Sequence, residues 1–557
     1  FISTSFYDYA SPVSDPIEKY YIVRHRLQKK DPSSSVSEPV KPIVYYLDNG
    51  TPEPIRSALL KGAGWWNQAF EAAGYKDAFI VKLLPDTADP MDIRYNMINW
   101  VHRSTRGWSY GNSVVDPRTG EIIKGQVSLG SLRVRQDYLI FSGLLAPYEN
   151  GVPANDQMLK AALARLSQLA AHEVGHTIGL EHNYISSVSN RASVMDYPHP
   201  LIRLNALGEM DFSQVYDDKI GEWDKVSITW GYQDFPAGTN EQQALNTILI
   251  TASKKGLQHI SDIDARAPGG LHPQAHLWDN GTNAVDELKE VMRVRAKALQ
   301  HFGINNVKPG IPMALLEDAL VPVYFYHRYQ LEAVTKLVGG MYYTYALRGD
   351  GQVVTRMLSK KEQLDALNAL IDCIDPETLI IPDKIAALIP PRPSGYSGSR
   401  ELFKKRTGLS FDVLSPAETG ADVPFSFLFN SERLNRMQQQ ETKGGLGVDE
   451  MITLLVNKTW KAYRRNGMEA LIQQQTEQIL LTYMLAASID ENNSYNVRSV
   501  MQKHIAGLKR YIEERQKYNA AMFGHYQLAL ERMKNPKDAK PTIHKAIPPG
   551  APIGCEQ

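Results

Sequence analysis

Residues 171–183 read AHEVGHTIGLEHN, the most informative stretch of the chain. His172 and His176 are four residues apart, so on a helix their imidazoles project from one face, about one turn from each other. Two ligands of one zinc ion need that separation. Glu173 occupies the next position, from which its carboxylate can act on a water at the metal. The stretch therefore predicts a helix that carries a zinc site.

Gly179 and His182 extend this pair to the pattern HExxHxxGxxH. Because glycine lacks a Cβ, Gly179 can take a left-handed conformation that ends the helix and lets His182 reach the same metal. Three neutral histidines leave a fourth position open, which is typical of catalytic zinc sites. A bare HExxH arises by chance in roughly one or two such chains per hundred, and the two added residues lower this by about a factor of 500. We expect one catalytic zinc ion.

The charge balance of the 557-residue chain excludes some partners. Lys+Arg number 61 and Asp+Glu number 61, a formal net charge of zero. This balance argues against a nucleic acid or an anionic membrane captured by bulk electrostatics. No uninterrupted apolar stretch approaches the roughly 18 residues that a membrane span needs. We therefore expect no nucleic-acid partner and no transmembrane segment.

The cysteine count restricts how a metal can be bound. The chain has two cysteines, Cys373 and Cys555, too few for a disulfide framework or a structural zinc site of cysteines. Any metal must then be held by histidines and carboxylates. Asp262 and Asp264 fall short of a calcium-loop pattern, so we expect no second metal.

The composition along the chain predicts three parts. Residues 1–36 are rich in Tyr and then in Ser and Pro, which predicts the tail of an upstream domain followed by a linker. The chain opens at Phe1 without a leader pattern, so we expect a trimmed fragment whose upstream domains are missing. Residues 37–235 show strand and helix patterns. Residues 236–557 are mostly helical in pattern, apart from a hairpin predicted around the Asp-Gly turn in residues 341–357.

The order of strands and helices in the middle part indicates an α/β or α+β fold. Apolar residues from Ile55 to Phe70 follow one face of a helix that stops at Gly74. A long helix is expected after Pro153, with Asn155 or Asp156 as its N-cap. A glycine-containing loop is expected around residues 107–120. Strands are expected at residues 42–47, 78–84, 93–102 and 126–129.

The long motif is the zinc signature of the metzincin clan of metallopeptidases, which this chain resembles. A second hallmark of that clan, a turn containing methionine, matches residues 193–197 (SVMDY), where Met195 stands thirteen residues beyond His182. The resemblance implies a zincin-like catalytic domain in which Met195 packs beneath the three histidines. It also implies that Tyr197 binds zinc or stabilises the oxyanion, as in astacin-like and serralysin-like members.

Other clan features can be placed by the same resemblance. Residues 216–232 are similar to the helix that closes the catalytic domain of matrixins and serralysins, which sets the boundary near residue 235. The strand near residues 125–131 stands in the order of the clan's edge strand, which pairs with an extended substrate. An ordinary covered edge is the alternative. The residues expected to bind substrate are Gly125, Gln126, Val127 and Ser128.

More narrowly, the chain resembles the bacterial "Met-zincin" family of zinc-dependent metalloproteases from about residue 10 to about residue 535. The similar segments are residues 42–75, the Asn183-Tyr184 pair after the third histidine, and residues 327–340 (HRYQLEAVTKLVGG). The resemblance implies a secreted or cell-envelope protein of a bacterium. Asn183 departs from the better-known branches, each of which has its own residue at this position.

The predicted function is therefore that of a zinc-dependent metalloendopeptidase acting on peptides or proteins. A zinc ion would acidify water and polarise the scissile carbonyl, Glu173 would be the general base, and Tyr197 would donate to the developing oxyanion. Two alternatives stay open. One is a zinc-binding but inactive recognition or scaffold protein of the envelope, and the other is a metallohydrolase that acts on a non-peptide amide.

Overall fold

A five-stranded sheet lies in the N-terminal part of the computed structural model, which describes residues 1–104, 109–151 and 156–541. Four strands run parallel, and the fifth, β6, runs antiparallel to its neighbour β7. In β3, Ile43, Tyr45 and Leu47 are buried and alternate with half-buried residues, as a strand packed on helices requires. The spatial order is β4 (Phe79–Leu83), β3 (Ile43–Leu47), β5 (Asn96–Val101), β7 (Ile122–Gly130) and β6 (Tyr110–Val115).

Helices α1 and α4 pack on this sheet and on each other. Their contact is close, because a Cβ on Gly62 would lie 1.9 Å from the backbone oxygen of Ser167. The apolar spacing from Ile55 to Phe70 predicts one helix, whereas the structure has two that meet at Trp65. The helices of this part are α1 (Ile55–Gly64), α2 (Trp66–Ala72), α3 (Leu132–Leu145), α4 (Gln157–Thr177) and α5 (Glu222–Tyr232).

The long helix begins where the sequence indicates. Asp156, one of the two expected N-caps, directly precedes α4, although its side chain makes no capping hydrogen bond. The other candidate, Asn155, lies outside the described residues, as does Pro153. The helix ends at Thr177, so His172 and His176 occupy its last two turns.

The prediction of a loop at residues 107–120 is wrong for residues 110–115, which form strand β6, and is confirmed for residues 116–120, which lie between β6 and β7. The sequence YGNSVV has polar and small residues on one face of the strand, so it lacks the apolar character by which a strand is recognised. Gly107 lies outside the described residues.

Strand β7 was expected at the edge of the sheet, and this expectation is also wrong. It pairs with β5 on one side and with β6 on the other, so that Gln126 stands opposite both Met97 and Asn112. With both sides occupied by neighbouring strands, its backbone cannot pair with an extended substrate. This corrects the substrate-binding role expected of Gly125, Gln126, Val127 and Ser128.

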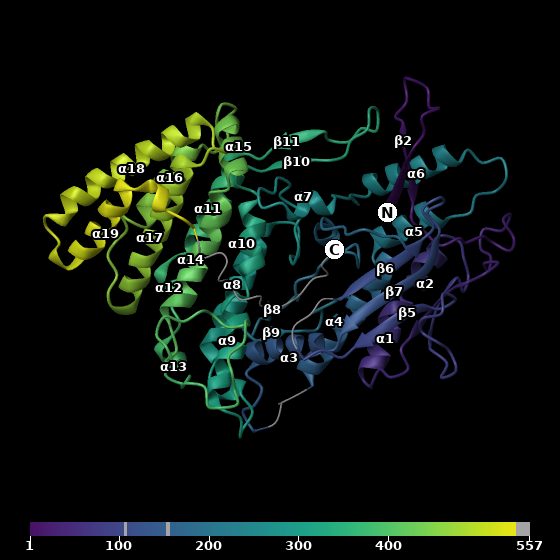
Figure 1. Ribbon diagram of the computed structural model, residues 1–557, viewed down its shortest axis with the longest axis horizontal. Helices are drawn as coiled ribbons and strands as arrows, with labels where there is room; N and C mark the ends of the chain where they lie inside the picture. The colour runs from purple at the N-terminus through teal and green to yellow at the C-terminus, as the bar shows by residue number, and fades with distance from the viewer. Residues whose placement is uncertain (105–108, 152–155, 542–557) are drawn as a thin grey trace.

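Within residues 1–36, Val23, His25, Leu27 and Lys29 are buried, whereas residues 31–36 of the expected linker are mostly exposed. Strands β1 (Ser3–Tyr7) and β2 (Glu18–Ile22) form an antiparallel hairpin that projects from the body of the molecule (Figure 1). After it the chain runs along the sheet domain, where Leu27 joins the core of that domain. The Arg24 guanidinium donates to the Gly231 carbonyl at the end of α5.

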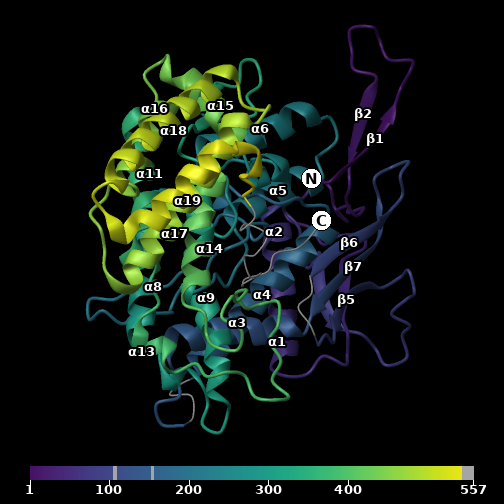
Figure 2. The ribbon, with the colours of Figure 1, turned by 60° about the vertical axis from the view of Figure 1, so that its left-hand side comes forward.

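The C-terminal part is mostly helical, and its last helices lie far from the sheet (Figures 1 and 2). None of the helices in the described part of the chain is long and apolar enough to cross a membrane. The helices are α6 (Glu241–Lys254), α7 (Asp262–Arg266), α8 (Ala284–His301), α9 (Leu316–Tyr324), α10 (Arg328–Thr335), α11 (Lys360–Cys373), α12 (Pro376–Leu379), α13 (Asp383–Ala386), α14 (Leu414–Leu428), α15 (Ser431–Glu441), α16 (Val448–Lys458), α17 (Gly467–Ile489), α18 (Tyr495–Gln516) and α19 (Phe523–Lys534).

Two small hairpins accompany these helices. Strands β10 (Met341–Tyr343) and β11 (Thr355–Met357) pair antiparallel, which confirms the hairpin predicted around the Asp-Gly turn. Strands β8 (Arg203–Leu204) and β9 (Met210–Asp211) form the other hairpin.

Hydrophobic cores join the two parts of the chain across the boundary expected at residue 235. One core combines Phe141 of α3 and Met158 of α4 with residues of the C-terminal helices. A smaller core joins Tyr184 and Tyr197 to Trp278. Residues on both sides of the boundary therefore pack together.

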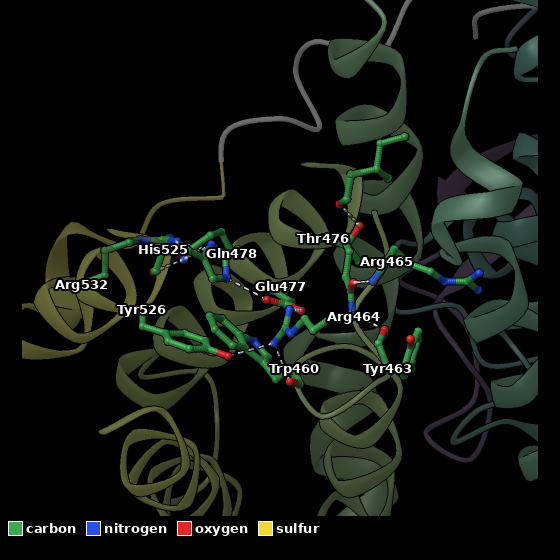
Figure 3. A network of polar contacts seen from close by, with 12 residues as sticks. Trp460, Tyr463, Arg464, Arg465, Thr476, Glu477, Gln478, His525, Tyr526 and Arg532 are labelled. Atoms are coloured by element: carbon green, nitrogen blue, oxygen red, sulfur yellow. Dashed lines mark hydrogen bonds and ion pairs between the residues drawn. The ribbon is translucent and has the colours of Figure 1, made fainter. Parts of the chain in front are cut away.

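A buried polar network holds the last helices (Figure 3). The Glu477 carboxylate on α17 is inaccessible to solvent and accepts from Arg464 Nη1 at 2.5 Å and from His525 Nε2 at 2.7 Å. The ring of His525, on α19, stacks on Trp460 with centroids 5.1 Å apart. The network thus ties the segment after α16 to α17 and α19.

Candidate metal centre

Three histidines meet at the end of α4. His172 and His176 come from the helix and His182 from the loop after it, and all three are buried. The ring centroids of the three pairs are 4.9, 5.2 and 4.7 Å apart. One ligand nitrogen from each ring can be chosen so that all three lie within 4.8 Å of one another. The sequence-predicted ligands are therefore brought together.

Hydrogen bonds set the tautomer of the two helix histidines. His172 Nδ1 lies 2.7 Å from the Val194 carbonyl, and His176 Nδ1 lies 2.8 Å from the Leu180 carbonyl. A carbonyl can only accept, so each Nδ1 carries the proton and each Nε2 keeps its lone pair. Both Nε2 atoms are buried without a hydrogen-bond partner among the described residues.

Burial also keeps these rings neutral. It lowers the pKa of His172 well below its usual value, with the neighbouring histidines adding to the effect. Burial and His182 lower the pKa of His176 to about 3. The pKa of His182 is lowered as well, mainly by burial. Neutral imidazole is the form that ligates a metal.

Gly179 makes the turn after α4 that places His182 beside His172 and His176. Its φ of +97° lies in the left-handed region, as expected for a residue just after the helix end. The backbone of Val23 also lies very close to Gly179, because a Cβ on Gly179 would be 1.8 Å from the Val23 carbonyl oxygen. Glycine is needed both for the conformation and for this contact.

Met195, expected beneath the histidines, packs against the helix that carries two of them. It is buried, and its sulfur would be 2.2 Å from a Cβ on Gly175, the residue before His176. Its carbonyl accepts from the backbone N–H of Asn183, 3.1 Å away. The methionine turn is thereby joined to the loop of the third histidine.

A buried carboxylate fixes this turn from α5. Asp224 accepts from the Ser193 hydroxyl at 2.5 Å and from the Val194 N–H at 2.8 Å. Burial raises the pKa of Asp224 to about 7, although these hydrogen bonds oppose the rise. The Val194 carbonyl in turn orients His172, so Asp224 supports a ligand through the backbone.

Glu173 is fully buried and lies where strand β6 crosses α4. A Cβ on Gly111 of β6 would be 2.1 Å from the backbone oxygen of Glu173, and the Ser113 hydroxyl donates to the Thr177 carbonyl. Within the described residues no strand pairs with the outer side of β6. The free edge of the sheet therefore runs directly beside the histidine motif.

Tyr197 is buried against two of the ligands. Its ring centroid lies 5.1 Å from that of His172 and 4.9 Å from that of His182. Its hydroxyl accepts from Arg266 Nη2 at 3.2 Å. Its carbonyl accepts from the Trp278 N–H at 2.8 Å.

Three further residues complete the surroundings, and the sequence did not reveal them. Tyr184 stacks on His182 with centroids 4.8 Å apart. Asp262 Oδ1 lies 3.5 Å from His182 Nδ1. The same oxygen forms an ion pair with Arg266 Nε, 2.7 Å away. The spacing of four between Asp262 and Arg266 is visible in the sequence as a helical ion pair, but no local signal connects it to a histidine eighty residues earlier.

The three histidines fit a zinc ion. They offer three neutral imidazoles, of which two have their Nε2 lone pair buried and without a protein partner. Their ligand atoms are close enough for one ion, and three protein ligands leave a position for water or substrate. This donor set is typical of catalytic zinc.

A family model described as Met-zincin matches residues 154–467, more than half of the chain. Neither the curated proteins nor the solved structures give a match. The matched segment begins at α4 and extends through α16, so it includes the histidine motif together with much of the helical part.

Proposed function

We propose that this chain, which belongs to the Met-zincin family, is a zinc-dependent metalloendopeptidase with a single catalytic zinc ion. The observation that carries the proposal is the cluster of His172, His176 and His182, with a glutamate on the same helix. A structural zinc site would have four protein ligands, whereas the cluster supplies three. The family assignment supports peptide hydrolysis as the reaction.

Each residue of the site has a proposed task. A bound zinc ion supplies Lewis acidity towards water and the scissile carbonyl. Glu173 accepts the proton from the attacking water and delivers it to the leaving amine. Tyr197 donates its hydroxyl proton to the oxygen that gains charge in the transition state.

The edge of the sheet supplies a place for the peptide. We propose that an extended substrate pairs with the outer side of β6 (Tyr110–Val115) instead of β7. Pairing with an exposed strand is a common mode of peptide recognition, because the backbone supplies the hydrogen bonds. The contact of Gly111 with Glu173 supports this choice, since it puts the edge beside the general base. Slower amide hydrogen exchange of β6 with a bound peptide would support it, and unchanged exchange in β6 would refute it.

Zinc content and cleavage test the proposal directly. We expect about one zinc per chain by elemental analysis, and cleavage of an unstructured protein such as casein that a chelator abolishes. Zinc without cleavage would favour the inactive scaffold. Release of acyl groups from small amides, with no cleavage of proteins, would favour the non-peptide hydrolase.

The proposed location is the bacterial cell envelope or the exterior. It rests on the resemblance of the sequence to bacterial metalloproteases of that location. Fractionation of cells expressing the complete protein tests it, and recovery in the cytoplasm alone would refute it.

A further inference from the structure

We infer that helix α7 of the C-terminal part belongs to the active centre, where Asp262 orients the zinc ligand His182 and Arg266 polarises the hydroxyl of Tyr197. The inference rests on the proposed function, because it assigns these residues roles toward the metal and the reaction. Both are positioning residues. They enter the site from beyond residue 235, outside the segment that holds the histidine motif.

The first step concerns the orientation of the third ligand. The Nδ1 atoms of His172 and His176 are held by backbone carbonyls, which His182 lacks. The Oδ1 atom of the Asp262 carboxylate lies 3.5 Å from the Nδ1 atom of His182. A carboxylate paired with a zinc-bound histidine fixes the ring and makes it a stronger ligand. Asp262 therefore completes a set of three acceptors, one for each histidine.

An ion pair with Arg266 holds Asp262 in this position. The Asp262 side chain is 24% exposed. The Arg266 Nε atom donates to Asp262 Oδ1 at 2.7 Å, and this is the oxygen that faces His182. Arg266 therefore fixes the carboxylate beside the His182 ring.

The second step concerns the two tyrosines. One Arg266 nitrogen, Nη2, donates to the Tyr184 hydroxyl at 2.6 Å and to the Tyr197 hydroxyl at 3.2 Å. The guanidinium lies 5.4 Å from the centroid of each ring. A phenol that accepts from a cation uses a lone pair, so its proton is directed to another acceptor. Arg266 thus makes Tyr197 a better donor to an oxyanion.

The helical part holds α7 in place. Lys336 is buried, and its Nζ donates to the Ala265 carbonyl of α7 and, at 2.8 Å, to the Ala275 carbonyl. The Ser261 N–H, just before α7, donates to the Tyr345 hydroxyl at 2.9 Å. Contacts from α10 and from the β10–β11 connection therefore position a helix of only five residues. This gives part of the helical half a role at the metal.

Zinc affinity tests the role of Asp262 without reference to catalysis. We expect Asp262→Ala to weaken zinc binding about 10- to 100-fold and to change the visible spectrum of the cobalt-substituted protein. Asp262→Asn keeps an acceptor without charge and should weaken binding less. Ile263→Ala changes an exposed side chain of the same helix and should change neither quantity. Wild-type affinity and spectrum in both Asp262 variants would overturn the assignment.

A double-mutant cycle tests the role of Arg266. We expect Arg266→Gln to lower kcat about tenfold with little change in KM, and to lower kcat less in a Tyr197→Phe background, where only its contact with Asp262 is lost. Full, independent losses from both changes would overturn the coupling. If wild-type protein binds zinc but cleaves no protein, the proposed function fails while the affinity test of Asp262 still applies.

Discussion

The sulfur of Met195 occupies the space beside Gly175, where a Cβ would stand only 2.2 Å from it. Gly175 lies on the zinc-motif helix between the first two histidines, so the helix and the methionine turn are packed without a side chain between them. The Trp66 ring fills the same space, 2.7 Å from that Cβ position. Gly175, Met195 and Trp66 are therefore closely packed, with no room for a larger side chain at position 175.

Gly175→Ala tests this contact. We expect a loss of about 1–3 kcal/mol in the free energy of unfolding, because the added methyl group overpacks a buried contact. Urea unfolding measures it. The control is Gly64→Ala at the end of α1, where a Cβ meets nothing within 4 Å and should be neutral or slightly stabilising. Equal effects of the two changes would contradict the packing argument.

Glu173→Ala separates zinc binding from catalysis. The carboxylate is the proposed general base, while the three ligands stay in place without it, so the variant should stay folded and still bind zinc. Hydrolysis should fall at least about 100-fold, the usual contribution of a general base. Glu173→Gln, which keeps the shape of the side chain, should lose activity to a similar extent. Undiminished cleavage with zinc bound would contradict the assigned role.

The metal ligands could be predicted because their pattern is local. A helix fixes the relation between His172 and His176 within one turn, and Gly179 fixes the return of His182. The left-handed conformation of Gly179 and the position of Met195 follow the same short range of sequence. Such information needs no knowledge of the rest of the fold.

The substrate edge and the support of the ligands could not be predicted in the same way. Whether β7 or β6 is the edge depends on strand pairing, which joins residues far apart in the chain, and the polar sequence of β6 concealed it as a loop. Asp262 and Arg266 reach the site because Ala265 of α7 packs in the hydrophobic cluster that contains Tyr184 and Tyr197. Sequence periodicity does not predict contacts between residues that are far apart in the chain.

Acid should destabilise the zinc-free protein through its buried histidines. The folded pKa of His176 is about 3, below its unfolded value of roughly 6.5, so the folded state binds fewer protons between these values. Its contribution to stability is present above about pH 6.5 and is lost as the pH falls towards 3. Urea unfolding of chelated protein at several pH values measures this. The His176→Asn variant should lose less stability over the same range, and an equal loss in both proteins would contradict the linkage.

Glu477→Ala tests the network that ties the last helices together. Removing the carboxylate leaves Arg464 and His525 without their shared acceptor, and the His525 side chain is only 7% exposed. Arg464 is 28% exposed and can reach water. We therefore expect the free energy of unfolding to fall by about 2–3 kcal/mol, less than for a fully buried pair. Asp365→Ala removes one partner of an exposed pair with Lys361, which should change stability by less than about 1 kcal/mol. Zinc binding should be unaffected in both variants, because the network lies in the helices distant from the metal centre. A loss in Glu477→Ala no larger than in Asp365→Ala would show that the network does not stabilise these helices.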